Sequence, residues 1–144
     1  MKKYFGIALV VVTLGFLTGC GSSNTLKCTQ TETYDEGTQT ETIKVSFSKD
    51  SIAKLEMTSQ IKVNNEYKDE LEEYKEELAE EKEYYEEQAG YSFNYKVTGN
   101  TATYTITADF AKLDDEEKES ILEYMGSDYD SVKKAYEAQG YKCK

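Results

Sequence analysis

The sequence contains no histidine, no proline, no tryptophan and no arginine. Histidine is the most common general base and a frequent metal ligand, so its absence argues against most acid–base and metal-dependent enzymes. The chain also lacks a GxSxG motif, a phosphate-binding P-loop and a dinucleotide-binding fingerprint. Pairs of carboxylates do not indicate a glycosidase, because a chain with 28 acidic residues contains any such spacing by chance. We therefore expect a protein that is not an enzyme and that binds no cofactor.

The charge balance is strongly negative, with a formal net charge of -11 at pH 7. Proteins that bind nucleic acid neutralise its phosphates with clustered cations, so we expect no nucleic acid partner. The same balance argues against attachment to anionic lipid by charge. The length suits one domain with a modest core.

The N-terminus has the pattern of a secretory signal. Lys2 and Lys3 precede an uncharged, mainly apolar run over residues 4–17, after which the chain becomes small and polar. The run is shorter than the roughly 20 residues that cross a hydrocarbon core, which argues against a permanent transmembrane helix. We predict that residues 1–19 are a signal peptide.

The four residues Leu17-Thr18-Gly19-Cys20 resemble the lipobox of bacterial lipoproteins. The resemblance implies that the Cys20 sulfur receives a diacylglyceryl group, whose two acyl chains suit stable membrane retention. An ordinary secreted protein with a spare cysteine is the alternative. We expect residues 20–25 to be the lipidated cysteine and a tether. Residues 26–144 would then form a single domain on the extracytoplasmic face of the cell membrane.

Alternation of apolar and polar residues predicts several half-buried strands. The alternating residues are Leu26 and Cys28; Ile43, Val45 and Phe47; Leu55, Met57, Ile61 and Val63; Tyr91, Phe93, Tyr95 and Val97; and Tyr104, Ile106, Ala108 and Phe110. Short turns at Gly37, residues 48–51 and residues 99–100 separate most of these segments. We predict an antiparallel sheet of about five strands with one buried face.

The C-terminal third changes to a helical period. Asp114 and Glu117 have the spacing of a capping box, and Gly126 is expected to end that helix. Ser127 is expected to start another helix, which stops at Gly140. The fold class is therefore α+β: a two-layer domain in which a long acidic helix and two C-terminal helices pack on the sheet.

The long acidic helix is expected over residues 66–88, with Asn65 as its N-cap and Gly90 as its stop. One narrow seam of this helix is mainly apolar, and it contains Tyr67, Leu71, Tyr74, Leu78, Lys82, Tyr85 and Ala89. The main interpretation is that the seam packs on its own sheet, and the second is that it pairs with another helix. Cation binding is the third, but glutamates around a straight helix diverge, so we expect no dedicated metal site.

Cys28 and Cys143 lie near the two ends of the expected domain. Exported proteins form disulfides, so we predict a disulfide between these two residues, which would close nearly the whole mature chain. Two buried thiols are the alternative. A catalytic thiol is disfavoured because no histidine is present to activate it.

A tyrosine-lined groove for sugars or peptides is a further hypothesis, since aromatic rings stack on such ligands. Its candidates are Tyr34, Tyr91, Tyr95 and Tyr104. The last three already occupy alternating strand positions, where burial in the core is the competing interpretation.

The order of these segments resembles the small bacterial lipoproteins of the YehR type. The shared features are the Cys20 lipobox, the strand IAKLEMTSQIKV, a helical insert, the hairpin YSFNYKVTGNTATYTITADF and the ending YEAQGYK. The resemblance implies a two-layer α+β domain and implies no activity or catalytic residues. The glutamate-rich insert departs from that family.

Two functional hypotheses follow. The first is a non-enzymatic, membrane-anchored lipoprotein that acts as an interaction or structural module of the cell envelope, with an envelope protein or the cell wall as its partner. The second is a lipoprotein that binds a small molecule or a cell-wall glycan. An exposed tyrosine cluster would favour the second, and tyrosines buried between sheet and helices would favour the first.

Overall fold

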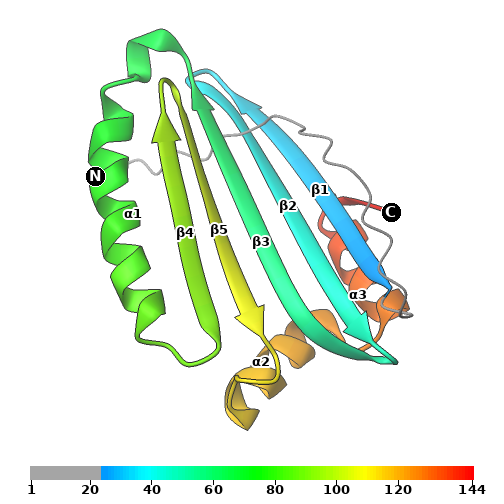
Figure 1. The fold of residues 1–144 in the computed structure, drawn as a ribbon. Coiled ribbons are helices and arrows are strands. Elements are labelled where there is room, and N and C mark those ends of the chain that lie inside the picture. The colour runs from blue at the N-terminus through cyan, green and yellow to red at the C-terminus, as the bar shows by residue number, and fades with distance from the viewer. Residues whose placement is uncertain (1–23) are drawn as a thin grey trace.

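The structure is a computed structural model that describes residues 24–144. These residues form one antiparallel sheet of six strands with three α-helices, which confirms the mixed α+β class (Figure 1). The strands are β1 (Thr25–Tyr34), β2 (Gly37–Ser48), β3 (Ser51–Val63), β4 (Tyr91–Thr98), β5 (Thr101–Asp109) and β6 (Lys142–Cys143). Their order across the sheet is β4-β5-β3-β2-β1-β6.

The strands differ from the sequence prediction at both ends of the chain. About five strands were expected, and the sixth is the short β6, which pairs with β1. Residues 139–141 separate it from the last helix. The shared parity of Tyr141 and Cys143 is compatible with a tail that runs beside the first strand, but two residues are too few to be counted as a strand from periodicity. Strand β1 already begins at Thr25, within the segment expected to be tether.

The acidic helix α1 (Glu70–Glu86) runs beside β4, the strand at one edge of the sheet (Figure 1). Leu71 and Leu78 on its seam are only 2% and 1% exposed and pack with Phe93 of β4. Lys82 lies in the same seam, and its Nζ reaches the carboxylate of Glu86. The seam therefore packs on its own domain, as the main interpretation predicted.

The start of this helix was predicted too early. Residues Asn65–Tyr67 form a short 3-10 helix, η1, and α1 begins at Glu70. Asn65 is therefore not the N-cap of α1, and the Asp69 side chain in that position makes no capping hydrogen bond. Asn64 instead donates from Nδ2 to the carbonyl oxygen of Asp35 at 2.8 Å. This bond ties the segment before the helix to the turn between β1 and β2.

Two further helices, α2 (Asp115–Met125) and α3 (Tyr129–Ala138), follow β5. The predicted capping box is present, since the Glu117 N–H donates to Asp114 Oδ1 at 2.8 Å. The predicted start of α3 at Ser127 was two residues too early, since the helix begins at Tyr129. Its N-cap is Asp128, whose carboxylate accepts the backbone N–H groups of the first turn and satisfies donors that the helix leaves open.

All three helices contribute to a core on one face of the sheet, which we call the covered face. One apolar cluster joins this face to α2 and α3, with Val45, Met125 and Val132 among its members. A second cluster joins it to α1 and includes Leu78 and Phe93. Among residues 24–144, no helix has both the length and the apolar character needed to cross a membrane.

Candidate functional site

The opposite face of the sheet, which we call the open face, is polar throughout. Side chains of a strand alternate between the two faces, so the strand register defines its members. They are Thr25, Lys27, Thr29, Thr31 and Thr33 of β1; Thr38, Thr40, Thr42, Lys44 and Ser46 of β2; Lys54, Glu56, Thr58, Gln60 and Lys62 of β3; Thr101, Thr103, Thr105, Thr107 and Asp109 of β5; Ser92, Asn94, Lys96 and Thr98 of β4; and Lys142 of β6. None of these side chains is apolar.

Threonine dominates this face. Every threonine within residues 24–144 belongs to it, and no tyrosine of that range does. Several hydroxyls are bonded across strands: the Thr31 and Thr40 oxygens lie 2.6 Å apart, and Gln60 Nε2 donates to Thr103 Oγ1 at 3.1 Å. Threonine suits a water-facing strand because its branched side chain fits the pleated surface and its hydroxyl stays solvated. The result is a broad, hydroxyl-covered surface on a rigid sheet.

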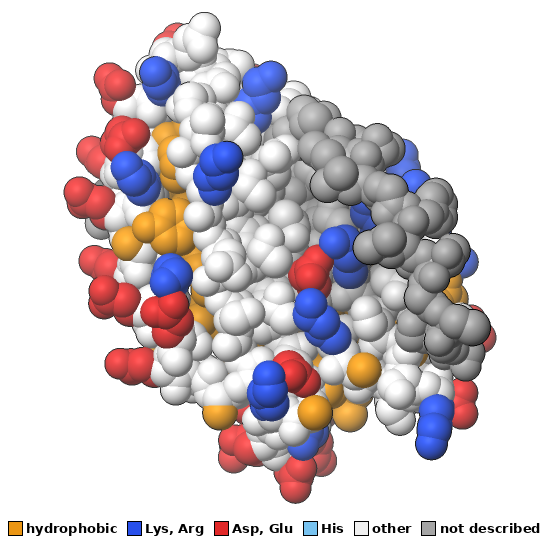
Figure 2. All heavy atoms as spheres, in the orientation of Figure 1, with side chains coloured by type: hydrophobic (Ala, Val, Ile, Leu, Met, Phe, Trp, Pro, Cys, Tyr) orange, Lys and Arg blue, Asp and Glu red, His pale blue; other side chains and the backbone are white. Residues whose placement is uncertain are grey.

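The charges of the domain are divided between its two sides. The open face carries six lysines and only two acids, Glu56 and Asp109, although the chain contains 28 acids. Figure 2 views the molecule from the open side: the visible part of the sheet is mostly white with blue lysines, and red acids gather along α1 and α2. The open face is therefore a locally cationic surface on an acidic protein.

Both acids of the open face are already paired with lysine. Glu56 lies 2.6 Å from Lys44 Nζ and 3.2 Å from Lys54 Nζ, and the hydrogen bond from Lys44 lowers the pKa of its carboxyl. A hydrogen bond from Lys112 similarly lowers the pKa of Asp109. Within residues 24–144, the other open-face lysines have no carboxylate within ion-pair distance; they are Lys27, Lys62, Lys96 and Lys142. These ammonium groups are available to an anion.

A shallow groove of about 740 Å³ lies on this face across β1, β2 and the C-terminal residues. Lys27, Lys44, Lys142 and Lys144 line it, together with threonines from three strands. Of residues 24–144, no aspartate or glutamate belongs to its lining. Its residue types suit a ligand that has both negative charge and hydroxyl groups.

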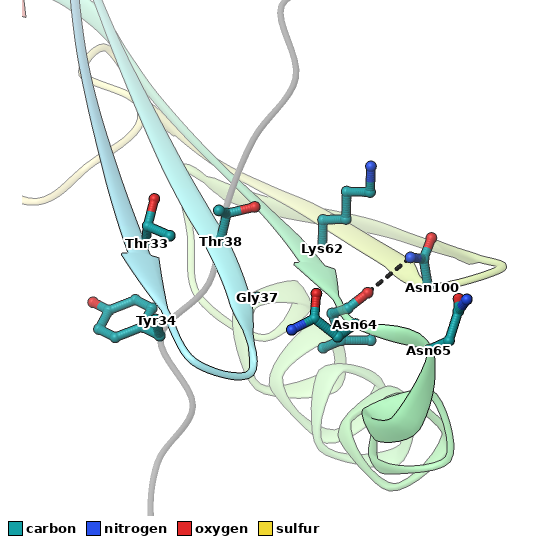
Figure 3. A pocket seen from close by; sticks show the side chains of 9 residues that line it. Thr33, Tyr34, Gly37, Thr38, Lys62, Asn64, Asn65 and Asn100 are labelled. Atoms are coloured by element: carbon teal, nitrogen blue, oxygen red, sulfur yellow. Dashed lines mark hydrogen bonds between the residues drawn. The ribbon is translucent and has the colours of Figure 1, made fainter.

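A second hollow, of about 490 Å³, lies at the end of the sheet where β1 meets β2 (Figure 3). Tyr34 and three asparagines line it, and Asn100 Nδ2 donates to the carbonyl oxygen of Val63 at 2.7 Å. Tyr34 is 40% exposed, and its hydroxyl donates to Glu32. This hollow, which we call the end pocket, combines amide, hydroxyl and aromatic groups.

The four tyrosines proposed for a groove do not come together. Tyr91, Tyr95 and Tyr104 lie on the covered face and pack around Phe93 and helix α1; the Tyr104 and Phe93 rings stack with centroids 5.7 Å apart. Tyr34 lies at the end pocket. Three of the four are thus partly buried packing residues between sheet and helix. The predicted tyrosine groove is not present in this form.

A row of polar groups crosses the covered face between the two apolar clusters. Tyr104 hydrogen-bonds the fully buried Ser59, and Gln39 Nε2 donates to Ser59 Oγ at 3.4 Å and to Glu41 Oε1 at 3.0 Å. The Tyr141 hydroxyl donates to the other Glu41 oxygen at 2.5 Å. Burial raises the pKa of both tyrosines. The row satisfies polar groups inside the domain and ties the C-terminal segment to β2.

The structure joins Cys28 and Cys143 as a disulfide, the pair that the sequence predicted. Cys20, the predicted lipidation site, and the predicted signal peptide lie outside the described residues. Among residues 24–144, no group of three or more histidine, cysteine, aspartate or glutamate side chains is arranged to hold a metal ion. The open face, which the sequence analysis did not single out, is the most distinctive surface of the domain.

The fold resembles that of a protein from Streptococcus pneumoniae TIGR4 whose structure was determined by NMR. The two match over 100% of this chain and 98% of that chain, with a TM-score of 0.56 and 16% sequence identity. At this identity the likeness concerns the fold alone. No protein-family model matches the sequence, and no curated protein matches it either. The resemblance to YehR-type lipoproteins therefore remains a hypothesis.

Proposed function

We propose that this protein is a non-enzymatic lipoprotein, held at the extracytoplasmic face of the cell membrane through Cys20, that acts as an interaction module of the envelope. The observation that carries the proposal is the open face, where every threonine of residues 24–144 gathers with six lysines. No helix of residues 24–144 packs on this face, and a face without apolar residues is stable in water, so it needs no partner for folding.

The packing of the tyrosines supports the interaction module over a tyrosine-lined groove. Phe93 and Leu78 are nearly inaccessible, and the rings around them fill the space between sheet and α1. Aromatic rings in such positions contribute to stability and are not available for stacking on a ligand. We therefore assign partner binding to the open face of the sheet.

The anchor is tested with the variant Cys20→Ala. Because the lipid site and the domain are separate parts of the chain, this variant should fold normally but leave the membrane fraction. Radiolabelled palmitate should enter the native protein and not the variant. Palmitate incorporation into Cys20→Ala would exclude Cys20 as the lipid site.

The interaction surface is tested by site-specific photocrosslinking in cells. Benzoylphenylalanine replaces Thr105 near the centre of the open face in one variant and Glu76 on the exposed side of α1 in a matched variant. Crosslinked products are expected from position 105 and not from position 76. Products from position 76 alone would place the interaction on the acidic helix and contradict the proposal.

The end pocket supports a second candidate function, the binding of a small molecule or a cell-wall glycan. Tyr34 is the one exposed member of the proposed tyrosine set, and it lines this pocket together with Asn64 and Asn100. A ligand that binds the native state raises its melting temperature by mass action. A saturable shift with a wall glycan that Tyr34→Ala abolishes would favour this function, and an equal shift in both proteins would exclude the pocket.

A further inference from the structure

We propose that the open face binds a linear polyanion made of phosphodiester-linked polyol or sugar units. The inference deepens the proposed function, because it names the class of partner for the same face. It rests on a row of cations, on the hydroxyl surface beside them, and on the types of side chain that this face lacks.

Three lysines stand next to one another: one on β2, one on β1 and one that directly follows β6. Lys27 and Lys44 are direct partners in the register of β1 and β2. On the other side of Lys27, the backbone N–H of Lys144 donates to the Lys27 carbonyl oxygen at 2.9 Å, and the reverse bond is 3.0 Å. Directly opposed side chains have Cβ atoms about 5 Å apart, and like charges in this arrangement repel. Lys142 lies one step further along the same groove.

Such a row lowers stability unless an anion offsets the repulsion. Glu56 accepts hydrogen bonds from Lys44 and Lys54, which neutralises one end of the row. Within residues 24–144, no carboxylate lies within ion-pair distance of Lys27 or Lys142. A phosphate between these two lysines would relieve the repulsion and gain two charge-assisted contacts.

Two further lysines of the open face extend this site into a long binding surface. Lys62 of β3 and Lys96 of β4 lie towards the opposite corner of the open face. With strands about 4.8 Å apart and about 3.3 Å per residue, the diagonal between the two lysine groups is roughly 25 Å. Thr42, Thr58 and Thr103 lie between them. Lysines at both ends and hydroxyls between them match an extended chain of alternating phosphates and hydroxyl-bearing units.

The composition of the face argues against nucleic acid as the polyanion. Single-stranded nucleic acid is held by aromatic rings on which its bases stack. All the tyrosines of residues 24–144 lie away from the open face, and no phenylalanine belongs to it. Duplex recognition requires an element that enters a groove, whereas this surface is a broad sheet. Threonine hydroxyls both donate and accept hydrogen bonds, which suits a polyol phosphate.

The test measures binding of a synthetic glycerol-phosphate oligomer to the full-length protein, produced with its own export signal and purified in a non-ionic detergent. The face variant combines Lys27→Gln, Lys44→Gln and Lys142→Gln. A control variant combines Lys68→Gln, Lys118→Gln and Lys134→Gln, which change the net charge equally on the helical side. We expect binding to weaken at least about tenfold in the face variant and to change less than about twofold in the control.

Salt dependence gives an independent readout. Each phosphate contact contributes a slope of about −0.7 to the dependence of log affinity on log salt in single-stranded polyanions. Because Glu56 already pairs with Lys44, loss of the Lys27 and Lys142 contacts should reduce the slope by about 1.4, a change that a general loss of stability would not produce. An unchanged slope would overturn the assignment of these lysines.

Two further probes separate the possible partners. A single-stranded oligonucleotide of equal charge and vesicles of anionic phosphatidylglycerol are measured in the same way. Tighter binding of either probe than of the oligomer would overturn the proposal, as would absence of oligomer binding. Crosslinking of a protein at position 105 without oligomer binding would reject this inference while leaving the proposed interaction module intact. Oligomer binding that both variants lose equally would reject the open face as the site.

Discussion

Cys28 and Cys143 are direct register partners on two neighbouring antiparallel strands, and the disulfide between them closes a loop with a sequence separation of 115 residues. The two residues on either side of this bond, Lys27 and Lys144, exchange a pair of backbone hydrogen bonds. The short β6 is therefore held covalently as well as by its ladder. The same link fixes Lys142 and Lys144 beside Lys27 in the lysine row.

Reduction of the disulfide should lower the stability of the domain. The chain-entropy model gives about 4 to 5 kcal/mol for a loop of this length, which corresponds to roughly 10–20 °C in melting temperature. The measurement is a thermal melt with and without reductant, with the double variant Cys28→Ala/Cys143→Ala as a control that should not respond to reductant. An unchanged melt, after mass spectrometry has shown the oxidised form beforehand, would contradict the predicted stabilisation.

Truncation of a buried side chain in the seam of α1 should lower the stability of the domain strongly. Leu78 is 1% exposed, and Leu78→Ala removes buried apolar surface and leaves a cavity, so we expect a loss of about 2–5 kcal/mol in the free energy of unfolding. Glu76→Ala on the exposed side should change it by less than about 0.5 kcal/mol. Urea unfolding of the two variants measures both values. Equal, small losses would mean that the helix contributes little to the fold.

High pH should destabilise the domain through its buried tyrosines. Burial raises the pKa of Tyr136 to about 12, so the folded state retains a proton that the unfolded state loses near pH 10. The contribution of Tyr136 to the free energy of unfolding is fully present below pH 10. It is lost as the pH rises to about 12, by up to about 1.4 kcal/mol per pH unit. The free energy of unfolding of Tyr136→Phe should differ from that of the native protein by a constant amount between pH 7 and 9. Above pH 10 it should fall less steeply with pH than that of the native protein. Parallel curves over the whole range would refute this linkage.

Gly37 should tolerate no side chain. A Cβ at this position would lie 2.2 Å from the carbonyl oxygen of Lys62, which belongs to the adjacent strand β3. Gly37→Ala should therefore destabilise the domain by about 1–3 kcal/mol or more, because backbone must move. Gly99→Ala is the matched control: its Cβ meets open space, and only the positive φ of 64° opposes it, at about 1 kcal/mol. Equal losses in the two variants would count against the close approach.

Much of the fold could be predicted because burial leaves a period of two in the sequence. Ile43 and Val45 alternate with polar residues, and this pattern alone placed β2 and its neighbours. The capping residues of α2 were also readable, since the Asp114 and Glu117 bond is local. The start of α1 was not readable, because Asn64 donates to the carbonyl oxygen of Asp35 in the β1–β2 turn, which lies 29 positions earlier in the chain.

The open face could not be recognised from the sequence alone. Threonines in separate strands share a surface only after register is fixed, and register depends on pairings such as Lys27 with Lys44. The apolar residues of each alternating segment predict the core. The polar residues between them form the open face, but their pattern within one strand does not show that they share a surface with other strands. The separation of tyrosines from threonines becomes informative only once the two faces are assigned.

The direction of β1 determines how the domain would be oriented on a membrane if Cys20 is the anchor. The strand starts at Thr25, only five positions after Cys20, and the chain between them can span no more than about 18 Å. Its other end, Tyr34, lies roughly 30 Å further along the sheet, at the end pocket. A protein held by Cys20 would carry its strands pointing away from the bilayer. The end pocket would then lie furthest from the lipid, and the lysine row would lie close to it.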